Sequence, residues 1–330
     1  MPLKRIITII LILIVAASLI AAFTIMPGGP GRKSALPQKQ IGVITLEGVI
    51  MSGSSGFLSA AGTDDILRQL HDAAEDPDIA ALVIRINSPG GTVAASQELY
   101  QEALRVKESG KKLVVSMGDV AASGGYMVSC AADKIVANPG TTTGSIGVIM
   151  EFQNIEGLYD KLGLKENVIK SAPHKDIGSP TRPMTEDERA ILQDMINEMY
   201  GQFVDIVAKG RHMDVEEVKK LADGRVYTGT QAKKLGLVDE IGNYYDAIKI
   251  AADLAGIKGK PVIKEYGKKS TLEALLSGVK SIVNTFLDPA FGIRLPADPG
   301  TTLPTWRDFS HHSYFLDYLP DKVAQSYLYP

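Results

Sequence analysis

The sequence predicts an α/β protein in which a parallel sheet is flanked by helices and is preceded by one N-terminal transmembrane helix. Segments typical of strands and of helices alternate between residues 41 and 150, which is the order that builds parallel sheets. The segment "IAALVIRINS" (79–88) is apolar at almost every position, as expected of a strand buried on both faces. The third observation is that residues 6–26 carry no charge.

The N-terminal segment is long enough to cross a bilayer. At about 1.5 Å per residue, a helix over residues 6–26 extends roughly 30 Å, close to the thickness of the hydrocarbon core. A cleaved signal peptide has a shorter apolar core, so we expect an uncleaved anchor in residues 1–27. Residues 28–40 are rich in proline, glycine and polar residues and predict a linker. Basic residues lie on both sides of the apolar segment, so charge counting does not give its orientation.

The expected elements of the first half follow one another without long gaps. β-branched and apolar residues predict strands at 41–50, 79–88, 111–118, 134–137 and 145–150. Helical patterns predict helices at 64–75, 92–110 and 123–132.

Helices dominate the second half. The helix expected at 185–210 is amphipathic, begins with a capping box formed by Thr185 and Glu188, and has Gly210 as its expected end. Shorter helices are expected at 214–223, 230–234 and 244–255. We therefore expect one compact domain over residues 41–257 and a C-terminal extension over residues 258–330, with an amphipathic helix at 271–287.

Composition argues against several classes of function. The formal net charge is −3, which gives no reason to expect a nucleic-acid partner. The chain has one cysteine, Cys130, so neither a disulfide framework nor a cysteine-based zinc site is expected, and Cys130 is expected to pack as a small apolar residue. None of the five histidines has a metal-binding spacing, so we expect no metal and no cofactor.

Two glycine-rich turns follow neighbouring predicted strands. The amides of "NSPGGTV" (87–93) are suited to binding an anion or a developing oxyanion, although a plain tight turn has the same pattern. In "ASGGY" (122–126), Ser123 lies at a strand-to-helix turn, where a serine is either an exposed nucleophile or a helix cap. Because turns after successive parallel strands open at the same sheet edge, the two turns are expected to share one site.

A serine nucleophile needs a base to take its proton. The segment "KSAPHKDIGSP" (170–180) offers two, His174 and Lys175. Histidine is the usual base, whereas a lysine serves when desolvation disfavours its ammonium form. The residues alone leave both pairings open.

Three segments together carry a resemblance to a known family. "INSPGG", "ASGGYMVSCAADKIVANPGTTTGSIGV" and "KSAPHKDIGSPTRPMTEDER" resemble the signal peptide peptidase A family, membrane-anchored serine peptidases with a Ser–Lys dyad. The resemblance covers roughly residues 41–255 and implies the Clp protease and crotonase type of fold. It is closest to the short single-repeat form, in which one chain supplies both members of the dyad.

The resemblance also implies roles for individual residues. Ser123 matches the nucleophile and Lys175 the general base, while Ser145 matches the serine that orients the lysine amine. Gly124, together with Gly90 or Gly91, is implied as the oxyanion hole.

The function implied is the degradation of remnant signal peptides after their release from preproteins. The implied location is the cell membrane, with a single span and the catalytic domain on the extracytoplasmic side. A ring-like or dome-like homo-oligomer is also implied, with the helix at 185–210 and those after it as candidate contacts. The partners are therefore peptide substrates, the membrane and further copies of the chain.

Other functions remain open at the level of sequence. A related Ser–Lys peptidase that cleaves a membrane-protein partner has the same residues. An acyl-CoA enzyme of the crotonase type uses similar oxyanion turns but needs no Ser–Lys pair. A catalytically silent peptide-binding scaffold is the third alternative, and retention of both Ser123 and Lys175 argues against it.

Overall fold

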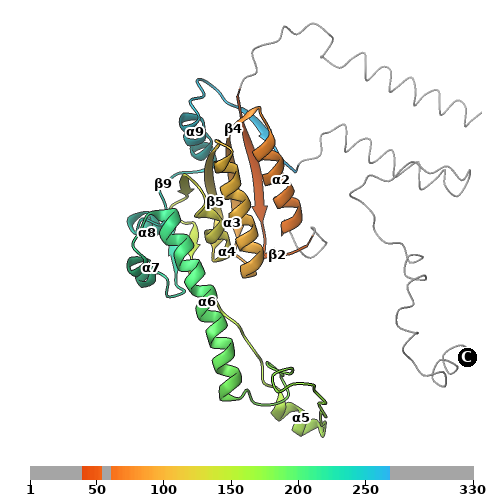
Figure 1. The fold of residues 1–330 in the computed structure, drawn as a ribbon. Helices are drawn as coiled ribbons and strands as arrows, with labels where there is room; N and C mark the ends of the chain where they lie inside the picture. Colours follow the sequence, from red (N-terminus) through yellow and green to blue (C-terminus); the bar gives the residue numbers. More distant parts are fainter. Residues whose placement is uncertain (1–38, 54–60, 268–330) are drawn as a thin grey trace, which may run out of the picture. The chain divides into compact units, whose positions relative to one another are not determined.

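A mostly parallel sheet lies at the centre of the computed structural model, which describes residues 39–53 and 61–267 (Figure 1). Within these residues the sheet has eight strands, six of them in the order β10-β1-β4-β5-β6-β9, while β7 pairs with β5 and β8 with β7. All pairings are parallel except that of β7 with β8. The strands are β1 (Gln40–Glu47), β4 (Ile79–Ser88), β5 (Lys112–Ala122), β6 (Lys134–Ala137), β7 (Thr142–Gly144), β8 (Val226–Thr228), β9 (Glu240–Ile241) and β10 (Val262–Glu265), with a separate pair, β2 (Ile50–Met51) and β3 (Ala61–Gly62).

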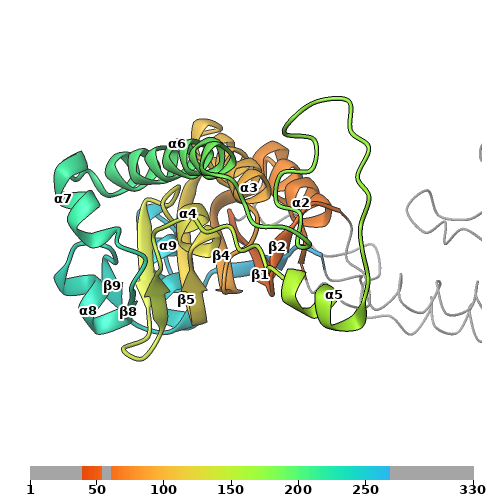
Figure 2. The same ribbon diagram turned by 90° about the horizontal axis from the view of Figure 1, so that it is seen from below.

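Helices cover both faces of this sheet. Figure 2 shows α2, α3 and α6 together on one side, and α9 packs on β4 and β5 from the other. The helices are α2 (Thr63–Glu75), α3 (Val93–Glu108), α4 (Gly124–Ser129), α5 (Glu156–Leu162), α6 (Glu186–Arg211), α7 (Val215–Leu221), α8 (Gly229–Lys234) and α9 (Tyr244–Leu254). The expected α/β architecture with a parallel sheet is confirmed.

The core explains why β4 is apolar along its whole length. Leu82 and Ile84 belong to the large cluster that includes residues of α2 and α3. Ala81 and Val83, which alternate with them, belong to a second cluster with residues of α9. Successive side chains of a strand point to opposite faces, so a sheet covered on both sides needs apolar residues at every position.

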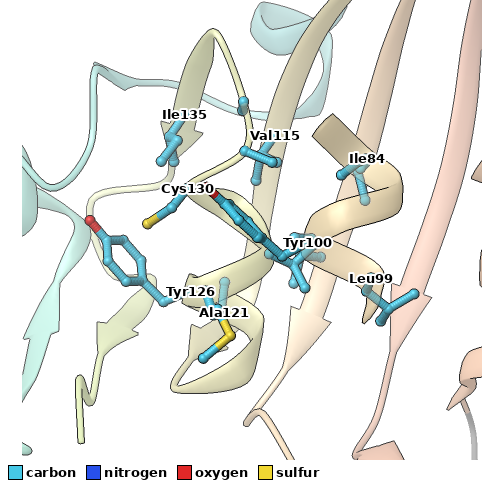
Figure 3. Packing of buried hydrophobic residues seen from close by; sticks show 14 of the residues in the cluster. Ile84, Leu99, Tyr100, Val115, Ala121, Tyr126, Cys130 and Ile135 are labelled. Carbon is cyan, nitrogen blue, oxygen red and sulfur yellow. The ribbon is translucent and has the colours of Figure 1, made fainter. Parts of the chain in front are cut away.

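Cys130 lies within the large cluster, close to the rings of Tyr100 and Tyr126 (Figure 3). Cys130 is 2% exposed, and burial raises the pKa of its thiol to about 12. The Tyr126 hydroxyl donates a hydrogen bond of 2.9 Å to the Leu237 carbonyl, which satisfies a polar group in the same region. The prediction that Cys130 packs as a small apolar residue is confirmed.

Several boundaries differ from the sequence-based expectations. The strand expected at 41–50 ends at Glu47 and is followed by the separate β2, and the helix expected at 123–132 ends at Ser129. The strand expected at 145–150 is wrong, because β7 ends at Gly144 and the next residue, Ser145, takes a left-handed φ of 50°. β5 runs to Ala122 because its second half pairs with β7. α6 continues past Gly210, where a Cβ would lie 2.2 Å from the Cys130 carbonyl oxygen, so this glycine permits close packing and does not end the helix.

The compact unit also extends beyond its predicted end at residue 257. Strand β10 pairs in parallel with β1, and the Tyr266 amide donates to the Val43 carbonyl at 2.9 Å. This unit therefore includes the chain up to Gly267. The expected anchor over residues 1–27 and the expected helix at 271–287 lie outside the described residues, and within those residues no helix is long and apolar enough to span a membrane.

Residues 148–185, here called the arm, join β7 to α6. The arm extends away from the sheet and carries the short helix α5 at its far end (Figures 1 and 2). No residue between Gly147 and Asp187 is buried. The arm therefore takes no part in the core of its own chain.

Candidate functional site

Ser123 lies where β5 ends and α4 begins, with φ 51° and ψ −120°. Residues other than glycine rarely adopt this backbone conformation, and such strain is concentrated at functional sites. Its amide donates to the Gly144 carbonyl at 2.9 Å, and its side chain makes no capping hydrogen bond to α4. The capping interpretation is therefore not supported, and the strained turn is typical of an exposed nucleophile.

The two glycine-rich turns lie directly against each other. Gly90 has φ 100°, and a Cβ built on it would lie 2.6 Å from the Gly124 nitrogen and 2.8 Å from the Ser123 Cβ. These separations leave no room for any side chain at residue 90. The turn after β4 and the turn after β5 thus meet at one edge of the sheet, as parallel strands require.

The hydrogen bonds decide which amides are available at this edge. The Gly90 amide donates to the Ser88 hydroxyl at 3.1 Å and is already used. The Gly91 and Gly124 amides donate no hydrogen bond to any described part of the chain. The Gly91 nitrogen lies 3.3 Å from the point where a Cβ of Gly124 would stand, so the two free donors are close together. Gly91 with Gly124 is therefore the better-formed pair for holding an oxyanion.

Ser145 is held beside Ser123 by the short ladder of β5, β7 and β8. The Gly144 carbonyl accepts the Ser123 amide, and the amide of the next residue, Ser145, donates to the Arg225 carbonyl at 2.9 Å. Ser145 also takes a left-handed conformation, with φ 50°. The two strained serines are therefore linked through Gly144, the last residue of β7, which accepts the Ser123 amide and directly precedes Ser145.

Strand β8 and its contacts are part of this site that the sequence patterns did not reveal. The Tyr227 ring packs against Gly144, where a Cβ would lie 2.6 Å from the ring carbon Cδ2. The short run "VYT" between Gly224 and Gly229 has β propensity and was the available signal. A run of three residues is too short to be identified as a strand without its partner.

Lys175 and His174 lie elsewhere, in the exposed part of the arm. The Lys175 side chain has no hydrogen bond or ion pair with any described residue. His174 faces Asp187 at the start of α6, with its Nε2 3.4 Å from a carboxylate oxygen. A single chain therefore brings together Ser123, Ser145 and the glycine amides, and brings neither proposed base to them.

The chemistry available at the sheet edge is that of an alcohol beside two free amides. Among residues 39–53 and 61–267, no group of three or more histidine, cysteine or acidic side chains is placed to hold a metal ion. An alcohol beside unpaired amides suits attack on a carbonyl, whose oxygen becomes negatively charged and needs donors.

Comparisons with known proteins agree with this reading. The sequence profile of peptidase family S49 matches residues 105–258. A putative protease of Synechocystis is 47% identical over 60% of this chain and 71% of its own length. A putative signal peptide peptidase SppA of Enterococcus faecium is 40% identical over 64% of this chain and 62% of its own length. Protease 4 of Salmonella typhi is 36% identical over 78% of this chain, which spans only 41% of that relative.

Proposed function

Because the chain belongs to peptidase family S49, the family of the signal peptide peptidase A enzymes, and is therefore a serine peptidase, we propose that Ser123 is its nucleophile and Lys175 its general base. The observation that carries the proposal is the strained Ser123 beside the unpaired amides of Gly91 and Gly124. Strain of this kind persists only where the surrounding structure imposes it.

The proposed reaction proceeds in two halves. The neutral amine of Lys175 takes the proton of Ser123 as the serine oxygen attacks the scissile carbonyl, and the oxyanion is held by the amides of Gly91 and Gly124. Collapse breaks the C–N bond, the leaving amine takes the proton from Lys175, and an acyl-enzyme remains. Water, deprotonated by Lys175, then releases the acid and restores Ser123. Ser145 hydrogen-bonds the lysine amine and orients it.

The arm indicates how Lys175 reaches a nucleophile. Large apolar side chains of the arm stand in solvent, among them Ile149 (78% exposed), Leu162 (63%) and Ile169 (101%). Large exposed apolar side chains gathered on one segment are typical of an interface. The resemblance implied that one chain supplies both members of the dyad, but the Lys175 side chain has no partner among the described residues. We therefore propose instead that a second copy of the chain covers this surface, so that the arm of one copy brings Lys175 to Ser123 of its neighbour in a homo-oligomer. Assembly then removes water from the amine, which disfavours the ammonium form.

The proposed substrate and location rest on the family resemblance and on the apolar N-terminal segment. We propose that the peptidase degrades remnant signal peptides and is held in the cell membrane by residues 1–27, with its catalytic domain on the extracytoplasmic side. The apolar segment 6–26 and the relative named as a signal peptide peptidase support this assignment. Cleavage of a membrane-protein partner by the same residues is the alternative that substrate assays separate.

The test uses the full chain in detergent or vesicles, with three variants. Ser123→Ala and Lys175→Ala should each abolish hydrolysis of a signal-peptide substrate, and His174→Ala should keep most of it. A fluorophosphonate probe should label Ser123 in the wild type and not in Ser123→Ala. An active Lys175→Ala enzyme would refute the dyad, and turnover of acyl-CoA with no peptide hydrolysis would favour the crotonase alternative.

A mixing experiment tests the shared site. If each site takes its serine and its lysine from different copies, random co-assembly of the two inactive variants restores about a quarter of wild-type activity. If both residues come from one chain, the mixture stays inactive.

A further inference from the structure

The turn that carries Lys175 is held by charged side chains although the arm has no core of its own. The Arg182 guanidinium donates to Asp176, with 3.0 Å from its Nε to Oδ2 and 3.2 Å from its Nη2 to the backbone oxygen. The same guanidinium donates to both carboxylate oxygens of Glu188, at 2.9 and 2.5 Å. Arg182 therefore ties the residue next to Lys175 to the first turn of α6.

Glu188 is itself fixed by the start of α6. Its carboxylate accepts the Thr185 amide at 3.0 Å, and its own amide donates to the Thr185 hydroxyl at 3.2 Å, which completes the capping box. Hydrogen bonds from Arg182 and from the Thr185 amide lower the pKa of Glu188 to about 2. Arg182 therefore binds an ionised carboxylate whose position is fixed by the N-terminus of α6.

Asp176 receives two cations on one carboxylate. The Lys170 ammonium lies 2.6 Å from its Oδ1, and this ammonium also donates to the Pro173 carbonyl at 2.8 Å. Hydrogen bonds from Arg182, and then from Lys170, hold the pKa of the Asp176 carboxyl well below its usual range. The side chain of Asp176 is largely covered, whereas its neighbour Lys175 is exposed and has no partner among the described residues.

Further contacts join the first part of the arm, near Phe152 and Ile155, to the part near Gly178 and Pro180. Gly178 has φ 80°, and a Cβ there would lie 2.6 Å from the Phe152 ring. The Ile155 amide donates to the Pro180 carbonyl at 2.7 Å. The turn is therefore held in one geometry by contacts within the arm and by contacts with the first turn of α6.

We propose that Arg182 is a positioning residue for Lys175, which fixes the turn against α6 and keeps the Asp176 carboxylate away from the lysine amine. The inference rests on the proposed function, in which Lys175 must be neutral to accept a proton. A free carboxylate beside an amine stabilises the ammonium form and opposes that step. The charged and titratable groups that form the ion pairs of this turn and of the start of α6 are Lys170, His174, Asp176, Arg182, Asp187 and Glu188.

The test compares pH profiles of kcat/KM for the full chain and its variants. Arg182→Gln removes the charge and frees the Asp176 oxygen Oδ2, while Lys170 keeps its contact with Oδ1. We therefore expect kcat near neutral pH to fall about tenfold or more and the acidic limb of the kcat/KM profile to move about one pH unit higher, with KM little changed. The double variant Arg182→Gln with Asp176→Asn lacks this carboxylate, so the acidic limb of its pH profile should return towards the wild-type position. Arg182→Lys, which keeps the charge but not the forked geometry, should lie between wild type and Arg182→Gln.

Controls separate this role from a structural one. Arg68→Ala breaks an exposed ion pair with Asp65 on α2 and should leave the profile unchanged. Thermal unfolding and oligomer mass for each variant report loss of structure directly. An unshifted limb in Arg182→Gln and Arg182→Lys, or a limb that Asp176→Asn fails to restore, overturns the inference. The proposed function fails by a different result, an active Lys175→Ala enzyme.

Discussion

Gly90→Ala tests whether the contact between the two glycine turns sets the catalytic geometry. A Cβ at this residue would lie 2.6 Å from the Gly124 nitrogen and 2.8 Å from the Ser123 Cβ. Ordinary contacts between such atoms are about 3.5 Å, so the Gly124 amide has to move by roughly 0.9 Å. The same substitution places an L residue at a φ of 100°.

The expected losses can be separated by their causes. Left-handed strain costs about 1–2 kcal/mol and overpacking about 1–3 kcal/mol, so the free energy of unfolding should fall by about 2–5 kcal/mol. A displacement near 1 Å at a reacting group costs about 10²-fold, similar to the loss of one oxyanion donor, so kcat should fall about 10²–10³-fold.

Gly110→Ala is the matched control. Gly110 also has a left-handed φ, 87°, but a Cβ there meets nothing within 4 Å. This variant should be destabilised by the left-handed strain alone, which lowers Tm by about 2–8 °C and leaves peptide hydrolysis normal. Peptidase kinetics and thermal unfolding are measured on both variants. Wild-type kcat in Gly90→Ala, or equal loss of activity in Gly110→Ala, would refute the reasoning.

Three further predictions concern other parts of the chain. Tyr126→Phe leaves the buried Leu237 carbonyl without its 2.9 Å donor and should cost about 1–2 kcal/mol in urea unfolding, and an unchanged midpoint would contradict this. Burial favours a raised pKa for Asp239, but bonds from Arg211 and the Ile135 amide outweigh it and lower the pKa, so its stabilisation is complete above about pH 4 and is lost as pH falls through the folded value. Acid titrations of unfolding should show a smaller loss of stability in Asp239→Asn, and identical slopes would argue against this role. Ile169→Glu places a charge at a fully exposed apolar position of the arm and should reduce both oligomer mass in sedimentation and peptide hydrolysis, whereas an intact active oligomer would exclude this face as an interface.

Local patterns predicted much of the fold correctly. The strand at 79–88, the helix that follows the Thr185 and Glu188 capping box, and the burial of Cys130 are each set by features within a few residues. Periodicity and capping depend on near neighbours, so they can be read without knowledge of the fold. The glycine-flanked position of Ser123 was visible for the same reason.

The rest depended on contacts between distant parts of the chain. Strands β8 and β10 are short and exist because β7 and β1 pair with them, more than eighty residues away in sequence. The choice of Gly91 over Gly90 as a free donor was decided by the Ser88 hydroxyl, which takes the Gly90 amide only once the turn has closed. Sequence alone placed Ser123 and Lys175 in the motifs of a serine peptidase. Only the tertiary structure showed that the lysine stands on an arm whose apolar side chains have no cover within the described chain, because burial is a property of the folded surface and not of a motif.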